Sequence, residues 1–123
     1  MTRILYVEDN EDNIFIIQRR LGKIGHEVLV AKDGLEGIRI ARAEQPALIM
    51  MDLDLPRLDG WEATRRLKST PETANIPVIA VSAYAMPQDR RRALDAGCDN
   101  FFSKPVDMPA LCSAIDTLVP PQP

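Results

Sequence analysis

Acidic, hydroxyl and amine side chains follow four of the five short apolar runs in this chain of 123 residues. They are Glu8 and Asp9 after the first run, Asp52 and Asp54 after the third, Ser82 after the fourth and Lys104 after the fifth. Clustered carboxylates repel one another and raise each other's pKa unless a cation neutralises them. Their oxygen atoms suit a hard divalent ion, and a site with few protein ligands favours Mg²⁺.

A carboxylate beside such an ion can serve as the nucleophile of a phosphoryl transfer. Asp9 and Asp52 could bind Mg²⁺ directly, and a backbone carbonyl in the loop after Asp52 could complete the protein ligands. Lys104 and Ser82 would then hold a dianionic phosphoryl group from the other side, which is nearly all that phosphoryl transfer requires. Attack by the carboxylate on phosphorus would give an aspartyl phosphate.

Each of these residues also has an ordinary structural interpretation when it is considered alone. The acidic residues 8–12 could be a solvated turn that caps a helix. Asp52 could be a simple loop residue, and Ser82 could be a turn hydroxyl. Their joint placement after strands one, three, four and five favours a functional site.

The elements that must position these residues can be read from the hydrophobic pattern. Strands are expected at residues 4–7, 27–31, 48–51, 76–81 and 100–103. Helices are expected at about residues 12–24, 35–44 and 60–68, at 87–96, and after a cap at Asp107. The second strand is the weakest of the five and suits an edge, whereas the uninterrupted apolar run at 48–51 suits a strand buried on both faces.

This regular alternation predicts an α/β fold in which a doubly wound, five-stranded parallel sheet has helices on both faces. In such a sheet, ligands bind beyond the carboxyl ends of the strands. That is where the chemically active residues follow the apolar runs. We expect one domain over residues 1–119 and a Pro-rich tail at 120–123.

Composition narrows the possible partners and the compartment. Fifteen Lys and Arg against 18 Asp and Glu give a net charge of −3, which does not favour direct DNA binding. Apolar runs are too short for a membrane span, and the N-terminus lacks the pattern of a signal peptide. Cys98 and Cys112 lack a CxxC spacing, so we expect free thiols in a cytoplasmic protein.

Residues 4–10, 48–60, 76–83 and 101–105 resemble the receiver domain of bacterial two-component response regulators, of the stand-alone, single-domain type. The resemblance extends to about Val119. It implies the flavodoxin-like strand order 2-1-3-4-5 for the predicted sheet. It also implies a domain that catalyses only its own phosphoryl transfer and a slow autodephosphorylation, and that is otherwise not an enzyme.

The resemblance implies a role for each residue of the cluster. Asp52 is the implied phospho-acceptor, Asp9 the direct Mg²⁺ ligand, Glu8 a ligand through water, Asp54 a ligand through its backbone carbonyl, and Lys104 the partner of the phosphoryl group. The bond between Lys104 and Pro105 is cis in the family. Asp54 and Tyr84 occupy two variable positions that flank the phosphoryl group.

Ser82 and Phe101 are the implied switch residues. The hydroxyl moves to bind the phosphoryl group, and the ring at position 101 follows it inward. This would alter the face formed by the fourth helix, the fifth strand and the last helix, and so control binding to a downstream protein target that the sequence does not name. Arg90–Arg92 begin the fourth helix and are either a solvated surface or a docking patch near that face.

The implied phosphodonor is a phosphohistidine of a sensor histidine kinase or histidine phosphotransferase. Family members meet the phosphotransfer helix along their first helix, where Asn13, Ile14 and Ile17 are candidates. Ile14 and Ile17 could equally be core residues, and the core is favoured for Ile17.

Two alternatives from other functional classes stay open on the sequence, whereas a mononucleotide-binding domain is disfavoured because its first turn should be glycine-rich and residues 8–12 are mostly acidic. A haloacid-dehalogenase-like phosphohydrolase also uses an aspartyl phosphate, a DxD motif, a hydroxyl and a lysine. In that family, however, the further acidic pair follows the lysine, and here Glu8 and Asp9 come first. The second alternative is an interaction module of the same fold that is never phosphorylated.

Overall fold

Strands and helices alternate along the chain in the computed structural model, which describes residues 2–55, 58–83 and 86–119. The strands are β1 (Arg3–Val7), β2 (Glu27–Ala31), β3 (Leu48–Asp52), β4 (Val78–Ser82) and β5 (Asn100–Ser103). The helices are α1 (Glu11–Lys23), α2 (Gly34–Glu44), α3 (Gly60–Ser69), α4 (Pro87–Asp95) and α5 (Met108–Leu118). Every predicted element is present, with ends that shift by one or two residues because caps and turns decide them.

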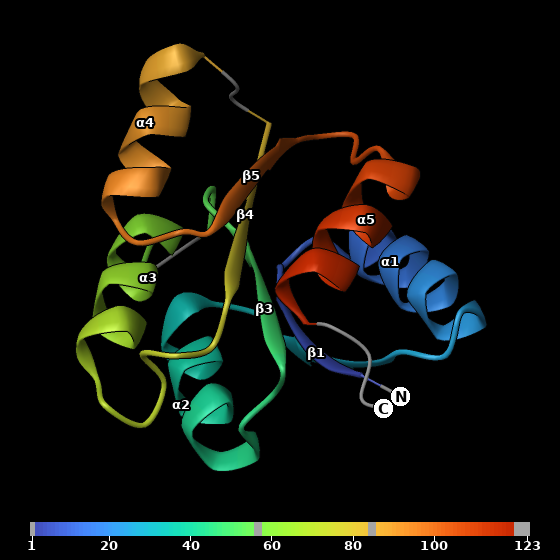
Figure 1. Ribbon diagram of the computed structural model, residues 1–123, viewed down its shortest axis with the longest axis horizontal. Coiled ribbons are helices and arrows are strands. Elements are labelled where there is room, and N and C mark those ends of the chain that lie inside the picture. The colour runs from blue at the N-terminus through green and yellow to red at the C-terminus, as the bar shows by residue number, and fades with distance from the viewer. Residues whose placement is uncertain (1, 56–57, 84–85, 120–123) are drawn as a thin grey trace.

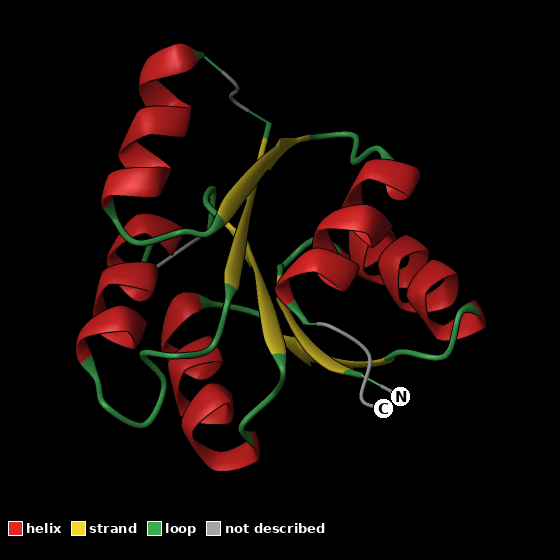
Figure 2. Cartoon of the chain, viewed as in Figure 1, coloured by secondary structure: helices red, strands yellow, loops and turns green. Residues whose placement is uncertain are grey.

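The five strands are parallel and lie in the order β2-β1-β3-β4-β5, as predicted. Helices α1 and α5 cover one face of the sheet, and α2, α3 and α4 cover the other (Figure 1). The strands therefore form a single layer between two layers of helices (Figure 2). The weak second strand lies at an edge, where it needs to bury only part of its surface.

Burial follows the pattern of apolar residues. All residues of β3 and β4 are buried, which explains why their sequences do not alternate between polar and apolar. On α1 the buried stripe consists of Ile14, Ile17 and Leu21, spaced three and four residues apart. Ile14 and Ile17 are therefore both core residues, and neither is available to a partner.

Short polar side chains fix where four of the described helices begin. Asn10, Asp33, Asp59 and Asp107 each accept a hydrogen bond from the backbone N–H three residues later. Such caps satisfy the otherwise unpaired N–H groups of the first turn. Each helix thus starts close after a strand or its loop, and the connecting loops stay at the carboxyl edge of the sheet.

Some sequence expectations concern residues outside the described ranges. They are Tyr84 beside the cluster and the Pro-rich tail at 120–123. Among the described residues, no helix is both long and apolar enough to cross a membrane. Cys98 and Cys112 are free thiols, as predicted. The peptide bond between Lys104 and Pro105 is cis.

Gly60, the first residue of α3, lies directly against the end of β3. A Cβ atom added there would come within 2.4 Å of the Asp52 carbonyl oxygen and 2.7 Å of the Leu53 Cα. Both are backbone atoms, so neither can move aside without displacing the strand end. The absence of a side chain at Gly60 therefore allows α3 to lie directly against the backbone of Asp52.

Gly60→Ala is expected to lower the free energy of unfolding by roughly 1–3 kcal/mol, because the added methyl group overpacks a backbone contact. Gly22→Ala is the matched control, since a Cβ at Gly22 in α1 would meet nothing within 4 Å. That control should raise the free energy of unfolding by roughly 0.5–1 kcal/mol through better helix propensity. Urea denaturation of the three proteins measures both changes, and equal effects at the two positions would contradict the packing argument.

Candidate functional site

The register of the parallel sheet brings the predicted site residues to one edge. Val7 lies opposite Met51, so Glu8 emerges beside Asp52. Asp52 lies opposite Val81, so Ser82 emerges one step further along the next strand. On the outer strand β5, Ser103 pairs with Ser82 and is followed by Lys104. Residues far apart in the sequence thus share the carboxyl end of β1, β3, β4 and β5.

Lys104 joins the two buried carboxylates of the site. Its Nζ lies 3.0 Å from Glu8 Oε1 and 3.2 Å from Asp52 Oδ2. Glu8 and Asp52 are each 1% exposed, whereas Lys104 is partly exposed and can reach solvent. A buried carboxylate without a partner would be very unfavourable, so the ammonium group is required to keep this pair inside the fold.

The Glu8 carboxylate accepts more hydrogen bonds than its position in the sequence indicates. Its Oε1 accepts hydrogen bonds from the Tyr6 hydroxyl at 3.0 Å and from Asn13 Nδ2 at 3.2 Å. Its Oε2 accepts from the backbone N–H groups of Asp9 and Asn10 at 3.1 and 3.3 Å. These contacts fix the carboxylate in one orientation.

Sequence reasoning missed the contribution of Tyr6 and Asn13 to this site. A signal for Tyr6 was present, because residues two apart in a strand share a face and Tyr6 precedes Glu8 by two. The sequence predicts Asn13 as a contact for the phosphotransfer helix, and the structure adds that its side chain donates to Glu8.

Asp9 completes a group of three carboxylates. One ligand oxygen each from Glu8, Asp9 and Asp52 lies within 4.8 Å of the others. Asp9 is exposed while the other two are buried, so the group opens toward solvent on one side. Three carboxylates against the single ammonium of Lys104 leave a surplus of negative charge. An all-oxygen donor set of this charge fits a hard divalent cation such as Mg²⁺.

Burial and close contact change the titration of the carboxylate pair. Burial, together with the hydrogen bond to Glu8, raises the pKa of Asp52 to about 7. Burial alone would raise the pKa of Glu8 as well, but hydrogen bonds with Asp52 and Lys104 outweigh it and lower that pKa to about 2. Without a cation the two groups therefore hold one proton between them in weakly acidic solution.

Asp54 and Ser82 meet on the other side of Asp52. The backbone N–H of Asp54 donates to Asp52 Oδ1 at 2.9 Å. The Ser82 hydroxyl donates to the Asp54 carboxylate, with oxygen distances of 3.3 and 3.4 Å. The backbone N–H of Ala83 donates to the same carboxylate at 3.0 Å. The carboxylate of Asp54 thus lies beside Asp52, at the flanking position that the resemblance implies for it.

Phe101 is buried in this structure, with 6% of its surface exposed. Its ring belongs to the core cluster that also contains Ala80, Ala93 and Cys98. Asparagine at position 100 binds the backbone N–H of Phe101 at 2.8 Å, which fixes this end of β5. The ring is therefore inward while the Ser82 hydroxyl points to Asp54.

The arginines at the start of α4 divide into two environments. Arg90 and Arg91 are exposed, as both a solvated surface and a docking patch would require. The Arg92 guanidinium instead stacks 4.0 Å from the ring centroid of Trp61, a cation–π contact that links α4 to α3.

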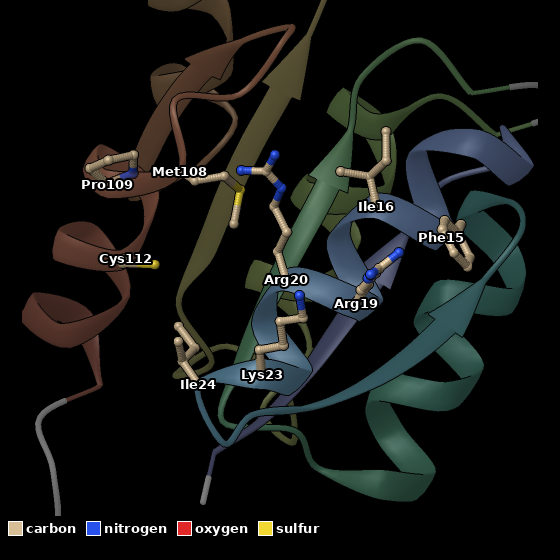
Figure 3. Close-up of a pocket in the computed structure, with 9 residues that line it drawn as sticks. All are labelled: Phe15, Ile16, Arg19, Arg20, Lys23, Ile24, Met108, Pro109 and Cys112. Atoms are coloured by element: carbon tan, nitrogen blue, oxygen red, sulfur yellow. The ribbon is translucent and has the colours of Figure 1, made fainter.

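A groove of about 740 Å³ lies between α1 and α5 (Figure 3). Figure 3 shows Met108 and Cys112 pointing from α5 toward Arg20 on α1 and Ile24, the residue after that helix. A smaller hollow, lined by Lys104, shares Ile16, Arg20 and Met108 with this groove. The groove is therefore continuous with the edge of the sheet that carries the charged cluster.

Comparison with known proteins identifies relatives of the whole chain. Residues 4–116 match the family described as the response regulator receiver domain. The chain is 39% identical over 112 residues to the polar-differentiation response regulator DivK of Brucella anthropi, and the match covers 91% of each chain.

The solved structures that share the fold at more than 25% identity include two receiver domains that bear on the site. One is the receiver domain of the sensor histidine kinase PA1611 from Pseudomonas aeruginosa, described with a magnesium ion coordinated in its active site cleft. It has a TM-score of 0.89 and 33% identity, and the match covers 96% of this chain and 97% of that one. The other is the receiver domain of Ssk1 from Saccharomyces cerevisiae, in a co-crystal with the histidine phosphotransfer protein Ypd1. Its TM-score is 0.88 at 30% identity, with coverage of 96% and 88%.

The raised pKa of Asp52 predicts a pH-dependent loss of stability. Its folded value of about 7 exceeds the ordinary value of 3.8. Between these values the folded chain keeps a proton that the unfolded chain has released. The free energy of unfolding therefore falls as pH rises through this window and levels off above about pH 7. The lowered pKa of Glu8 changes the free energy of unfolding only below its ordinary value of 4.5, so it does not affect a scan from about pH 5 to 8.

Asp52→Asn removes this titration, so its stability advantage over the wild type should grow from about pH 5 to about pH 7, reaching on the order of 1–3 kcal/mol. Urea denaturation in EDTA at several pH values measures it. Asp116→Asn, at an exposed position of α5, is the control and should keep the pH profile of the wild type. A constant offset for Asp52→Asn across the range would contradict the proposed burial of a proton.

Proposed function

Since this chain belongs to the response regulator receiver domain family, we propose that it works as a phosphorylation-dependent switch whose phospho-acceptor is Asp52. It is a signalling domain rather than a metabolic enzyme. One observation carries the proposal: the carboxylate of Asp52 is buried beside Lys104 and lies within ligand distance of Glu8 and Asp9. This places a nucleophile among groups that can balance the charge of a phosphoryl group.

The proposed reaction is a single displacement at phosphorus. A carboxylate oxygen of Asp52 forms a bond to the phosphorus of a phosphohistidine, and the P–N bond breaks. The electron pair of that bond stays on the imidazole nitrogen, which then takes up a proton. Lys104 lies beside Asp52 and can pair with the negative oxygens, and the Ser82 hydroxyl can donate to one of them.

A divalent cation fits the carboxylate side of the site. Asp9 and Asp52 would bind Mg²⁺ directly, Glu8 through water, and Asp54 through its backbone carbonyl. Such an ion would neutralise the surplus negative charge of the carboxylates and part of the charge on the transferred group. Tyr6 and Asn13 hold Glu8 in place on the same side.

Phosphorylation would be read through Ser82 and Phe101. The last residue of β4 is Ser82, and the neighbouring strand β5 carries Phe101 opposite Ala80. The Phe101 ring is already inward here, so a hydroxyl held by the phosphoryl group would keep it there, and this would bias the face of α4, β5 and α5 toward one of two states. We propose that a downstream protein recognises that face.

A sensor histidine kinase or histidine phosphotransferase is the proposed phosphodonor, and the groove between α1 and α5 is its proposed docking surface. The relative Ssk1 was crystallised with a histidine phosphotransfer protein, which supports a partner of this class. Phe15 and Ile16 on α1 and Ile24 directly after it are large apolar side chains that are 48–62% exposed. Arg19, Arg20 and Lys23 border them. This combination fits an amphipathic helix with acidic flanks.

The phosphohydrolase alternative has less support. Its chemistry would need the second acidic residue, Asp54, to protonate a leaving group, but the Asp54 carboxylate binds Ser82 and Ala83. The family match and the 39% identity to DivK both favour the signalling role. Steady hydrolysis of a phosphate ester by the purified protein would favour the alternative instead.

Asp52→Asn is expected to abolish phosphorylation, because an amide is a far weaker nucleophile than a carboxylate. The purified protein is incubated with acetyl phosphate and Mg²⁺, and intact mass shows whether a phosphoryl group labile to hydroxylamine has been added. The labelling rate should fall by about a hundredfold or more, and the exposed control Asp116→Asn should keep the wild-type rate. Labelling of Asp52→Asn at the normal rate would overturn the assignment.

The docking groove can be tested separately from the chemistry. The double variant Arg19→Glu/Lys23→Glu should slow transfer from a phosphohistidine protein that phosphorylates the wild type, by about tenfold, because charge reversal weakens encounter. Acetyl phosphate needs no docking surface, so its rate should not change. Arg65→Glu/Arg66→Glu on the opposite face, in α3, is the matched control. Equal slowing by both double variants would reject this groove as the docking surface.

A further inference from the structure

Asp54 contacts both sides of the site at once. Its backbone N–H holds Asp52 Oδ1, and its own carboxylate accepts from the Ser82 hydroxyl and the Ala83 N–H. We propose that this carboxylate is an internal competitor of the phosphoryl group, because it occupies the two donors that a phosphoryl oxygen on Asp52 would take. The inference rests on the proposed role of Asp52 as phospho-acceptor and concerns how readily that residue is phosphorylated.

The two donors lie just beyond Val81, the residue that pairs with Asp52 on the neighbouring strand. Asp52 ends β3 and lies opposite Val81, the residue before Ser82. A single residue, Asp54, spans from Asp52 Oδ1 to the Ser82 hydroxyl and the Ala83 N–H. A group attached to Asp52 that accepts from the same donors would therefore compete with the Asp54 carboxylate for them. Both groups are anionic oxygen acceptors, so they compete for the same kind of hydrogen bond.

The contact of the Asp54 carboxylate with Ser82 and Ala83 can be displaced. Asp54 is exposed, so water can solvate its carboxylate when the side chain swings away. Ser82 is fully buried and stays at the end of β4. Hydrogen bonds to a partly solvated charge contribute modestly, and we expect the competition to weaken the binding of a phosphoryl analogue about three- to tenfold.

The contact itself can be measured without phosphate or metal. In Asp54→Ala the Ala83 amide loses its carboxylate acceptor, so its proton resonance should move upfield and its hydrogen exchange should accelerate. Asp12→Ala removes an exposed acidic residue from the first turn of α1 and is the matched charge control. It should leave the Ala83 amide unchanged. An unchanged Ala83 amide in Asp54→Ala would overturn the inference.

The competition is measured with beryllofluoride, an analogue of the phosphoryl group, in the presence of Mg²⁺. Its dissociation constant should fall about three- to tenfold in Asp54→Ala. Asp54→Asn, which keeps an acceptor oxygen without the charge, should give a smaller decrease. The wild-type dissociation constant should persist in Asp12→Ala. Equal or weaker binding in Asp54→Ala would show that the Asp54 carboxylate does not compete.

Removal of the Asp54 charge could also strengthen beryllofluoride binding simply by reducing electrostatic repulsion. The Ser82→Ala background separates this effect from competition for the hydroxyl. If the carboxylate competes for the hydroxyl, the gain from Asp54→Ala should shrink when Ser82→Ala is already present. A gain of the same size in both backgrounds would reduce the effect to charge repulsion and overturn the inference. If the wild type binds no beryllofluoride and is not phosphorylated, the proposed function fails and the competition with it. Failure in the variants alone overturns only the competition.

Discussion

The buried contact between Glu8, Asp52 and Lys104 is the interaction on which the site depends. Two carboxylates that are 1% exposed share one ammonium group at 3.0 and 3.2 Å. Burial, together with the neighbouring Glu8 carboxylate, raises the pKa of Asp52 to about 7, and the pair retains a proton because one positive charge does not balance two buried negative charges. The same imbalance makes the site receptive to a cation, because a divalent ion can replace the proton and supply the missing charge.

The packing of the parallel sheet stabilises this unfavourable arrangement of buried charges. Strands β3 and β4 are buried over their whole length, so the positions of their last residues are fixed by packing on both faces. Gly60 allows α3 to lie against the carbonyl of Asp52, and the cap at Asp59 fixes where that helix begins. The charged side chains therefore project from an edge that packing holds in place, and of Glu8, Asp52 and Lys104 it is the lysine that reaches solvent.

Sequence reasoning predicted the elements, the strand order and the residues at the strand ends, because all three follow from apolar periodicity and from the family resemblance. It could not predict side-chain direction in the loops. Asn13 faces Glu8, and the Asp54 carboxylate faces Ser82, although neither orientation is encoded by a period of two or 3.6. The end of α1 and the start of β4 shifted for a related reason, since local hydrogen bonds decide such boundaries.

The contact between Asp54 and Ser82 bears on how far phosphorylation could shift this domain. A ligand moves a two-state equilibrium only by the difference in its interaction with the two states. Here the Ser82 hydroxyl is already bound to a carboxylate, and the Phe101 ring is already buried, with only 6% of its surface exposed. On the proposed mechanism a phosphoryl oxygen would exchange one anionic acceptor for another. The gain at Ser82 would then be the difference between two charge-assisted hydrogen bonds, which is smaller than the full value of one. The remaining gain must come from Lys104 and the bound cation, so in this domain the charge balance of the site would determine the size of the switch more than the hydroxyl does.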